Sequence, residues 1–222
     1  MNFILNIDTA LDTASVCLAK DEQILALAIN ENKKKQAGWL HLVIDEILKK
    51  NSLKPNQLDA VAVSIGPGSY TGLRVGLATA KGLCYALNIP LITVSTLKMI
   101  AFAAKEEASS LIFPMIDARR MEVFTAVYDK ALQEKNPAHP FIIDENSFSD
   151  ILSSSAVLFC GNGSKKLQPL ISNNNATFSD SISNASHLSP LSQNCFLKKE
   201  FADLAYTEPL YIKEFYSPVR KT

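Results

Sequence analysis

The chain has 222 residues, 47% of them hydrophobic, and its 22 basic and 22 acidic residues give a formal net charge of zero. This length suits one large domain or two small ones, and the balanced charge argues against a protein that grips nucleic acid by itself, which usually carries a basic excess. Four scattered cysteines and three scattered histidines predict neither disulfides nor a metal site. The absence of a signal-peptide pattern or a long apolar run predicts a cytoplasmic protein that does not contact a membrane.

The first half of the chain reads as three strands followed by alternating helices and strands. Strands are expected at 3–7, 15–19, 23–29, 58–65 and 91–94, and helices at 39–50, 70–88 and 96–108. The run at 58–65 is continuously apolar, which is typical of a strand covered on both faces. Three antiparallel strands followed by helix and strand in alternation are typical of a ribonuclease-H-like α/β unit.

The second half opens in the same way, with a strand, an aspartate, a turn and another strand. Strands are expected at 111–116, 122–128, 141–143 and 157–160, short helices at 147–152 and 165–170, a loop or weak helix at 172–194 and a last helix at 196–204. The repeated opening predicts a duplicated fold. We therefore expect an N-terminal lobe over 1–108 that carries the interface helices and a smaller C-terminal lobe of similar topology over 109–222.

The stretch IGPGSYTGLRVG, residues 65–76, joins a predicted strand to a predicted helix. It is not a Walker loop, because Leu73-Arg74 follows the last turn glycine where Lys-Ser/Thr is required. It is not a dinucleotide fingerprint, because Thr71 stands where the third glycine belongs, and Ser69 lies at the wrong offset for a nucleophile elbow. What remains is a sharp turn into a helix, with Ser69 as its N-cap.

The helix at 70–88 has an apolar surface wider than the roughly 100° stripe of an ordinary surface helix. One stripe is expected to lie on the sheet, and a second stripe is expected to face a neighbour that the glycines allow to come close. Two alternatives remain open: the helix at 39–50 covers the second stripe, or a second protein forms a helix bundle with it. In the second case the interface residues are Leu40, Val43, Ile47, Gly72, Val75, Gly76, Thr79 and Leu83.

Three segments of the chain resemble the TsaB family, also called YeaZ: FILNIDT at 3–9, GPGSYTGLRVG at 66–76 and DARR at 117–120 with the strand that follows. The order and spacing agree over nearly the whole chain, including the PLYI stretch at 209–212. The motif-loop residues that carry the resemblance are Gly66, Pro67, Gly68, Ser69, Tyr70, Thr71 and Arg74. The resemblance implies a two-lobed fold of the actin, sugar-kinase and Hsp70 type.

The resemblance also implies a function in making threonylcarbamoyladenosine, which lies beside the anticodon of tRNAs that read codons starting with A. In that family the protein is a non-catalytic partner without a cofactor. It binds and activates TsaD, a metal-bearing paralogue that transfers the threonylcarbamoyl group. A small ATPase, TsaE, joins the pair, tRNA is bound only through the complex, and homodimers form through the same helices.

This chain departs from the family pattern at Gln36-Ala37, where many members have His-Ser, and the change makes a metal-dependent activity less expected. Asp8, followed by Thr9, and Asp117 stand where related ATPases place phosphate-site acids. Each aspartate is interpreted either as a turn-capping carboxylate or as the remnant of a phosphate site. The alternative functions are a small ATP-dependent phosphotransferase or peptidase of the same fold, and direct tRNA binding by this chain.

Overall fold

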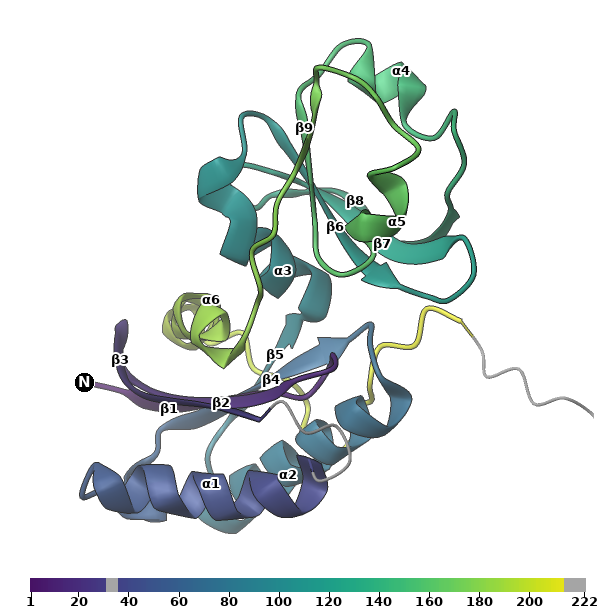
Figure 1. The fold of residues 1–222 in the computed structure, drawn as a ribbon. Coiled ribbons are helices and arrows are strands. Elements are labelled where there is room, and N and C mark those ends of the chain that lie inside the picture. Colours follow the sequence, from purple (N-terminus) through teal and green to yellow (C-terminus); the bar gives the residue numbers. More distant parts are fainter. Residues whose placement is uncertain (31–35, 214–222) are drawn as a thin grey trace, which may run out of the picture.

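The computed structural model describes residues 1–30 and 36–213 and has two lobes, each built on a five-stranded mixed sheet (Figure 1). The side chains of Gln36 and Ala37 lie outside the described part. The first sheet contains β1 (Phe3–Asp8), β2 (Ala14–Lys20), β3 (Gln23–Asn30), β4 (Ala60–Gly66) and β5 (Leu91–Ser95) in the order β3-β2-β1-β4-β5. The first three strands pair antiparallel, and β1, β4 and β5 pair parallel.

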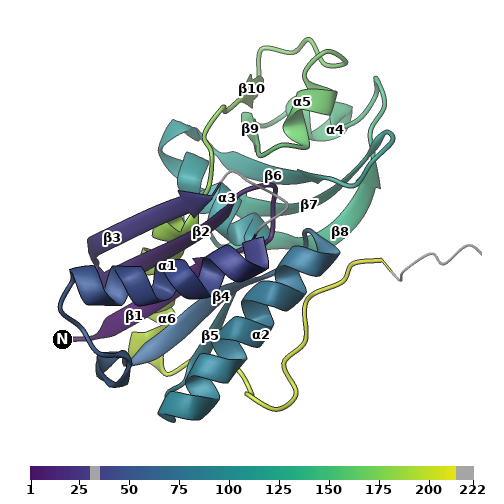
Figure 2. The same ribbon diagram turned by 60° about the horizontal axis from the view of Figure 1, so that its bottom comes forward.

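Helices cover both faces of the first sheet. Helices α1 (Gln36–Lys50) and α2 (Tyr70–Leu87) lie side by side on one face, as Figure 2 shows. Apolar side chains of both helices pack with the strands in one cluster, for example Leu40 and Val43 of α1 with Leu77 and Ala80 of α2. Helix α3 (Thr96–Ala104) lies on the other face and also packs against the second lobe, so it joins the two cores.

The second sheet has the same topology as the first. It contains β6 (Leu111–Asp117), β7 (Glu122–Asp129), β8 (Glu134–Ile142), β9 (Val157–Cys160) and β10 (Ala176–Phe178) in the order β8-β7-β6-β9-β10. Again the first three strands pair antiparallel, and β6, β9 and β10 pair parallel. The predicted duplication is therefore confirmed. The remaining short elements are η2 (Pro55–Gln57), η3 (Lys105–Glu107), α4 (Ser149–Leu152) and α5 (Ser164–Leu167).

Three sequence predictions about these elements are wrong. The last helix, expected at 196–204, is α6, which begins at Ala185 and ends at Lys198. Strand β8 is much longer than the expected 141–143, because it lies at the edge of its sheet and an edge strand tolerates Pro137 and Pro140. The segment 172–194, expected as a loop or weak helix, contains β10 and most of α6 (Ala185–Lys198). Helix α6 has Pro190 in its interior and buries polar residues such as Ser192 and Gln193, so its sequence lacks apolar periodicity.

The predicted lobe boundary also needs a correction, because α6 packs on the first sheet. Leu188 joins a cluster with residues of β1, β4 and β5, and Ser192 Oγ donates a hydrogen bond to Asn6 Oδ1 at 2.6 Å. The backbone N–H of Ala185 donates to Ser15 Oγ at 2.8 Å. Helix α6 thus belongs to the first lobe and not to a lobe spanning 109–222. The physical reason is that α3 covers only part of this face.

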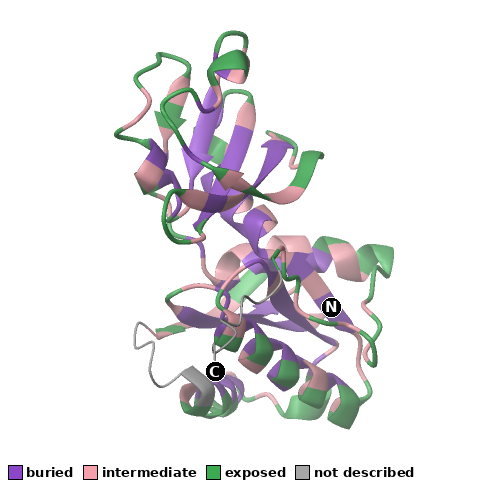
Figure 3. Ribbon diagram, turned by 90° about the vertical axis from the view of Figure 1, so that its right-hand side faces the viewer, coloured by how far each residue is buried: buried purple, intermediate pink, exposed green. Residues whose placement is uncertain are grey.

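Buried residues gather along both sheets and where α3 meets them (Figure 3). Within residues 1–30 and 36–213, no helix combines the length and hydropathy needed to span a bilayer.

Candidate functional site

The motif loop, residues 66–74, turns the chain sharply from β4 into α2. Gly66 has a φ of +123°, and a Cβ there would lie 2.6 Å from the carbonyl oxygen of Leu210, so the position requires glycine. The Gly66–Pro67 peptide bond is cis. Ser69 Oγ accepts a hydrogen bond from the N–H of Gly72 at 3.3 Å, which confirms the predicted N-cap. The loop therefore contacts its own chain and caps a helix.

Gly72 and Gly76 face the turn after β1, which corrects the expectation that they bring a partner close. A Cβ at Gly72 would collide with Thr9 O, and one at Gly76 would collide with Thr9 Oγ1. Thr9 Oγ1 also donates a hydrogen bond to Gly72 O at 2.7 Å. The two glycines thus serve the packing of α2 on the first sheet.

The other predicted interface residues lie mostly inside the fold. Leu40, Val43 and Ile47 of α1 are buried in the core cluster, Thr79 is buried, and Val75 and Leu83 are partly buried. Val75 and Leu83 thus pack on the cluster that includes α1, whereas Gly72 and Gly76 are covered by Thr9, so the helix at 39–50 covers only part of the second stripe. Whether these residues also contact a partner remains a prediction.

A different stripe of α2 faces outward. Ala78, Gly82 and Ala86 are exposed at four-residue spacing, with Tyr85 82% exposed beside them. A Cβ added at Gly82 would have no heavy atom within 4 Å. On α1, Leu42 is 68% exposed. We call these five residues the outer helix face. The interface residues predicted from the sequence do not include this exposed stripe, whose signal in the sequence is the run of small residues at 78, 82 and 86.

A shallow groove of about 380 Å³ runs between the two helices beside the outer helix face. Ile44 and Leu48 of α1 and Leu83 of α2 supply its apolar wall, and charged side chains of α1 and of the following loop form its rim. An apolar groove with a charged rim is typical of a surface that receives side chains of another protein.

The opposite flank of α2 is occupied by the end of the chain. Residues 201–213, here called the C-terminal strap, run along α2 toward the motif loop (Figure 2). Lys81 Nζ donates hydrogen bonds to the carbonyl oxygens of Ala205 and Thr207 at 3.1 and 3.2 Å. Farther along, the N–H of Leu210 donates to Ile65 O at 2.8 Å.

Two motif-loop residues hold the strap. The Arg74 guanidinium lies 3.9 Å from the centre of the Tyr70 ring, and its Nε donates to Tyr211 Oη at 2.9 Å. The hydrogen bond with Tyr211 raises the pKa of Arg74. Beyond it, Lys213 forms an ion pair of 2.6 Å with Glu122 of the second lobe. The strap therefore connects both lobes, and sequence reasoning did not assign this role to Tyr70 and Arg74.

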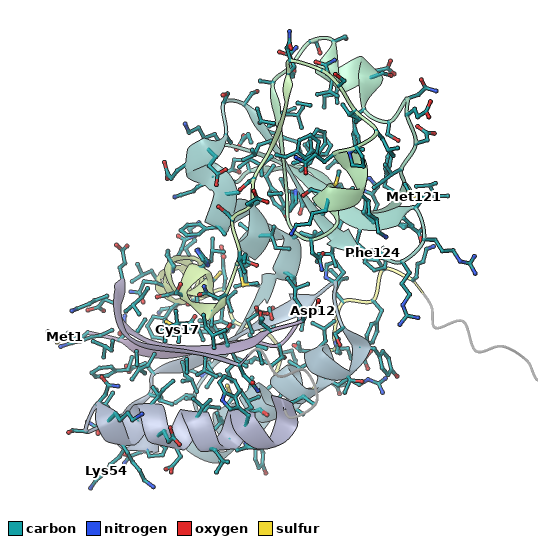
Figure 4. All side chains as sticks on the ribbon, in the orientation of Figure 1. Met1, Asp12, Cys17, Lys54, Met121 and Phe124 are labelled. Carbon is teal, nitrogen blue, oxygen red and sulfur yellow. The ribbon has the colours of Figure 1, made fainter. Side chains whose placement is uncertain are left out.

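A cavity of about 550 Å³ lies between the lobes and is lined by both of them. Asp12 and Thr71 come from the first lobe, and Phe124 and Asn162 come from the second; Figure 4 labels Asp12 and Phe124. Asp8 and Thr9, two of the residues expected at a phosphate site, are both fully buried and are not part of its lining, whereas Asp117 is exposed and lines the cavity.

Asp8 is held by its own lobe. Its Oδ1 accepts hydrogen bonds from Ser64 Oγ at 2.6 Å and from the N–H of Ala10 at 3.1 Å. Burial raises the pKa of Asp8 above its usual value, although both hydrogen bonds oppose the shift. This geometry suits a carboxyl group that secures a turn. Among the described residues, no group of three or more His, Cys, Asp and Glu side chains is placed to hold a metal ion.

Comparisons with known proteins add independent findings. A family model described as "TsaD: tRNA N6-adenosine threonylcarbamoyltransferase" matches residues 23–207. The tRNA threonylcarbamoyladenosine biosynthesis protein TsaB of Bacillus subtilis is 36% identical over 125 residues, which is 56% of this chain and 54% of that protein. The protein of the same name from Haemophilus influenzae is 36% identical over 136 residues, 60% of this chain and 55% of that protein. The chain thus spans about half the length of these curated relatives.

Two solved structures show the same fold over nearly the whole chain. YeaZ from Pseudomonas aeruginosa superposes with a TM-score of 0.80 at 23% identity, covering 95% of this chain and 100% of that chain. A second crystal structure, of an uncharacterized protein with similarity to peptidase YEAZ from Pseudomonas aeruginosa, gives a TM-score of 0.84 at 22% identity, with 96% and 100% coverage.

Proposed function

The chain belongs to the TsaB (YeaZ) family, within the wider family whose model is described as TsaD, and from this premise we propose that it is a non-catalytic subunit in tRNA threonylcarbamoyladenosine biosynthesis. In this proposal it binds and activates a TsaD-like, metal-bearing paralogue. The paralogue transfers the threonylcarbamoyl group to the adenosine beside the anticodon of tRNAs that read codons starting with A. The observation that carries the proposal is the outer helix face.

The outer helix face has the chemistry of a helix-packing surface. The distance between packed helices depends on the side chains at the contact, so Ala78, Gly82 and Ala86 would let a facing helix approach closely. Tyr85 is a large exposed side chain beside this stripe on α2, and Leu42 is a large exposed apolar side chain on the neighbouring helix α1; exposed apolar surface often marks an interaction site. A paralogue of the same fold offers an equivalent helix pair, and two related pairs facing each other form a bundle with approximate twofold symmetry.

The placement of Asp8 supports a non-catalytic role. A phosphotransferase would need this carboxylate, or a metal ion bound to it, to reach a phosphate group. Asp8 is instead 1% exposed and engaged with Ser64 and its own turn. The peptidase alternative gains no support from Ser69, since the hydroxyl of this residue caps α2.

The remaining partners follow from the family and not from any contact in the structure. A second copy of this chain would compete with the paralogue for the outer helix face. A TsaE-like ATPase would join the assembled pair, and tRNA would be bound by the complex.

The substitution Gly82→Arg tests the proposal, because position 82 opens into empty space and the variant should fold normally. We expect its association with the paralogue to weaken by about 30-fold, or about 2 kcal/mol, because a long charged side chain would be buried without a partner. Asn194→Arg is the matched control, since it adds the same charge at an exposed site on α6, across the first sheet.

Sedimentation velocity with the purified paralogue measures the association, and threonylcarbamoyladenosine formation on a tRNA transcript measures activation. Association of Gly82→Arg at the strength of the control would refute the assigned surface. Gly76→Arg is not a clean test, because its side chain would collide with Thr9 and disturb the fold.

A further inference from the structure

The turn between β6 and β7 carries two arginines in a backbone conformation that does not suit them. Arg119 has a φ of +70° and Arg120 a φ of +47°, in the left-handed region that favours glycine and asparagine. Both residues are exposed, so burial in a core does not explain their presence. Neither side chain is needed for the turn itself, because residues with a lower conformational cost would form it more readily.

The backbone of this turn is anchored from the side. Lys166 Nζ lies 2.5 Å from Asp117 Oδ1 and donates a hydrogen bond to Arg120 O at 2.6 Å. Asp117 Oδ1 also accepts from the N–H of Arg119 at 2.6 Å, and the Asp117 N–H donates to Asn162 Oδ1 at 2.9 Å. Partial burial alone would raise the pKa of Asp117, but the bonds from Lys166 and Arg119 outweigh it and the pKa is lowered. The turn is therefore held in place before any ligand arrives.

The acids next to the turn are already engaged. Asp117 is paired with Lys166 and Glu122 with Lys213. Asp144, which follows the residue whose N–H donates to Met121 O, accepts hydrogen bonds from the N–H of Asn146 and from Ser147 Oγ. With Asp12, which lines the interlobe cavity together with Arg119, these groups are four cations and four acids, so the positive charge at the turn is that of the two guanidinium groups themselves.

We propose that Arg119 and Arg120 bind the phosphodiester backbone of the tRNA when this chain is in complex with its paralogue. Guanidinium groups match phosphate oxygens in charge and geometry, and phosphate contacts position a nucleic acid without reading its sequence. An RNA backbone is favoured over an acidic protein surface because the matching family model describes a tRNA-modifying enzyme. This inference rests on the proposed function.

The position of the turn agrees with this role. Met121, which directly follows the two arginines and is labelled in Figure 4, lies in the second lobe. Helices α1 and α2 lie on the far side of the first sheet from this lobe (Figure 1). A partner docked on the outer helix face would therefore leave the turn accessible. A two-residue contact on a neutral chain also explains how the chain can contribute to RNA binding in a complex without gripping RNA strongly by itself.

The double variant Arg119→Asn/Arg120→Gly tests the proposal, because it removes both guanidinium groups while supplying residues that suit positive φ. Its thermal midpoint should rise by about 4 °C, since the strain is relieved. The matched control is Lys198→Asn/Lys199→Gly, which removes the same charge from the end of α6 and also places glycine at a positive φ, that of Lys199 at +57°.

Fluorescence anisotropy with an unmodified tRNA transcript measures binding to the complex over a series of KCl concentrations. For the arginine variant we expect about 30-fold weaker binding in low salt and a log–log salt slope smaller by about 2, because two phosphate contacts are lost. Affinity and slope equal to those of the control would overturn the proposal. Loss of binding to polyglutamate with unchanged tRNA binding would also overturn it, in favour of an acidic protein partner.

The same samples separate this inference from the proposed function. Sedimentation velocity shows whether the arginine variant still associates with the paralogue, as expected for a turn that is not part of the outer helix face. If the wild-type chain does not associate with the paralogue, the proposed function fails. In that case, tRNA binding by the full chain alone in low salt tests the assignment of the two arginines. We again expect weaker tRNA binding by the arginine variant, and an affinity equal to that of the control would overturn the assignment.

Discussion

Glycine-to-alanine substitutions at two positions of α2 should have opposite effects on stability. Alanine favours a helix interior over glycine by about 1 kcal/mol, and this gain applies at both Gly76 and Gly82. At Gly82 nothing opposes it, because an added Cβ has no heavy atom within 4 Å. At Gly76 the Cβ would collide with Thr9 Oγ1, which is buried and donates a hydrogen bond to Gly72 O at 2.7 Å.

The magnitudes follow from these contacts. Gly82→Ala should stabilise the monomer by about 0.5–1 kcal/mol. For Gly76→Ala, moving Thr9 loses a buried hydrogen bond worth about 1 kcal/mol and adds overpacking strain of about 1–3 kcal/mol. After the helix-propensity gain is subtracted, a net destabilisation of about 1–3 kcal/mol remains.

Urea unfolding followed by circular dichroism measures both variants, at low protein concentration so that association does not contribute. At about 2–4 °C per kcal/mol for a chain of this size, thermal midpoints should separate the two variants by several degrees. A Gly76→Ala variant at least as stable as wild type would refute the conclusion that this glycine serves contact with Thr9. A destabilised Gly82→Ala variant would refute the assignment of position 82 to open surface.

Two further predictions concern Asp8 and the strap. Burial raises the pKa of Asp8 above 3.8, so the folded protein binds the carboxyl proton more tightly than the unfolded chain does. The free energy of unfolding should therefore fall as the pH rises from about 3.8 through the folded-state pKa of Asp8. Asp8→Asn removes the contribution of this carboxyl group to the pH dependence. The stability of the variant relative to wild type, measured by urea unfolding at several pH values, should therefore increase over that range. Stability–pH curves that run parallel for the two proteins would contradict the reasoning. Tyr211→Ala removes the hydrogen bond to Arg74 and the ring contact with Tyr70. Trypsin should therefore cleave after Lys213 several-fold faster. The free energy of global unfolding should stay within about 1 kcal/mol of the wild-type value. An unchanged cleavage rate would show that Tyr211 does not hold the strap.

Local sequence patterns predicted most of the first lobe. The apolar runs of β1 and β4, the periodicity of α1 and α2 and the N-cap at Ser69 all depend on residues close together in the sequence. Most of edge strand β8 and most of helix α6 were not predicted, because prolines and buried polar residues obscure their periodicity. Ser192 can be buried in α6 only because Asn6, far away in the sequence, accepts its hydrogen bond.

The sequence by itself determined the duplicated α/β fold, the glycine turn and the family resemblance, because each depends on short segments of the chain or on the order of such segments. Only the tertiary structure decided which way each side of α2 points. Apolar and small residues cover so much of α2 that any of several stripes could face the sheet. The contact of Gly72 and Gly76 with Thr9 determines which stripe does so. That selection turns Gly82 outward and places Arg74 against the strap, because rotation about the helix axis is set by long-range packing and not by local periodicity.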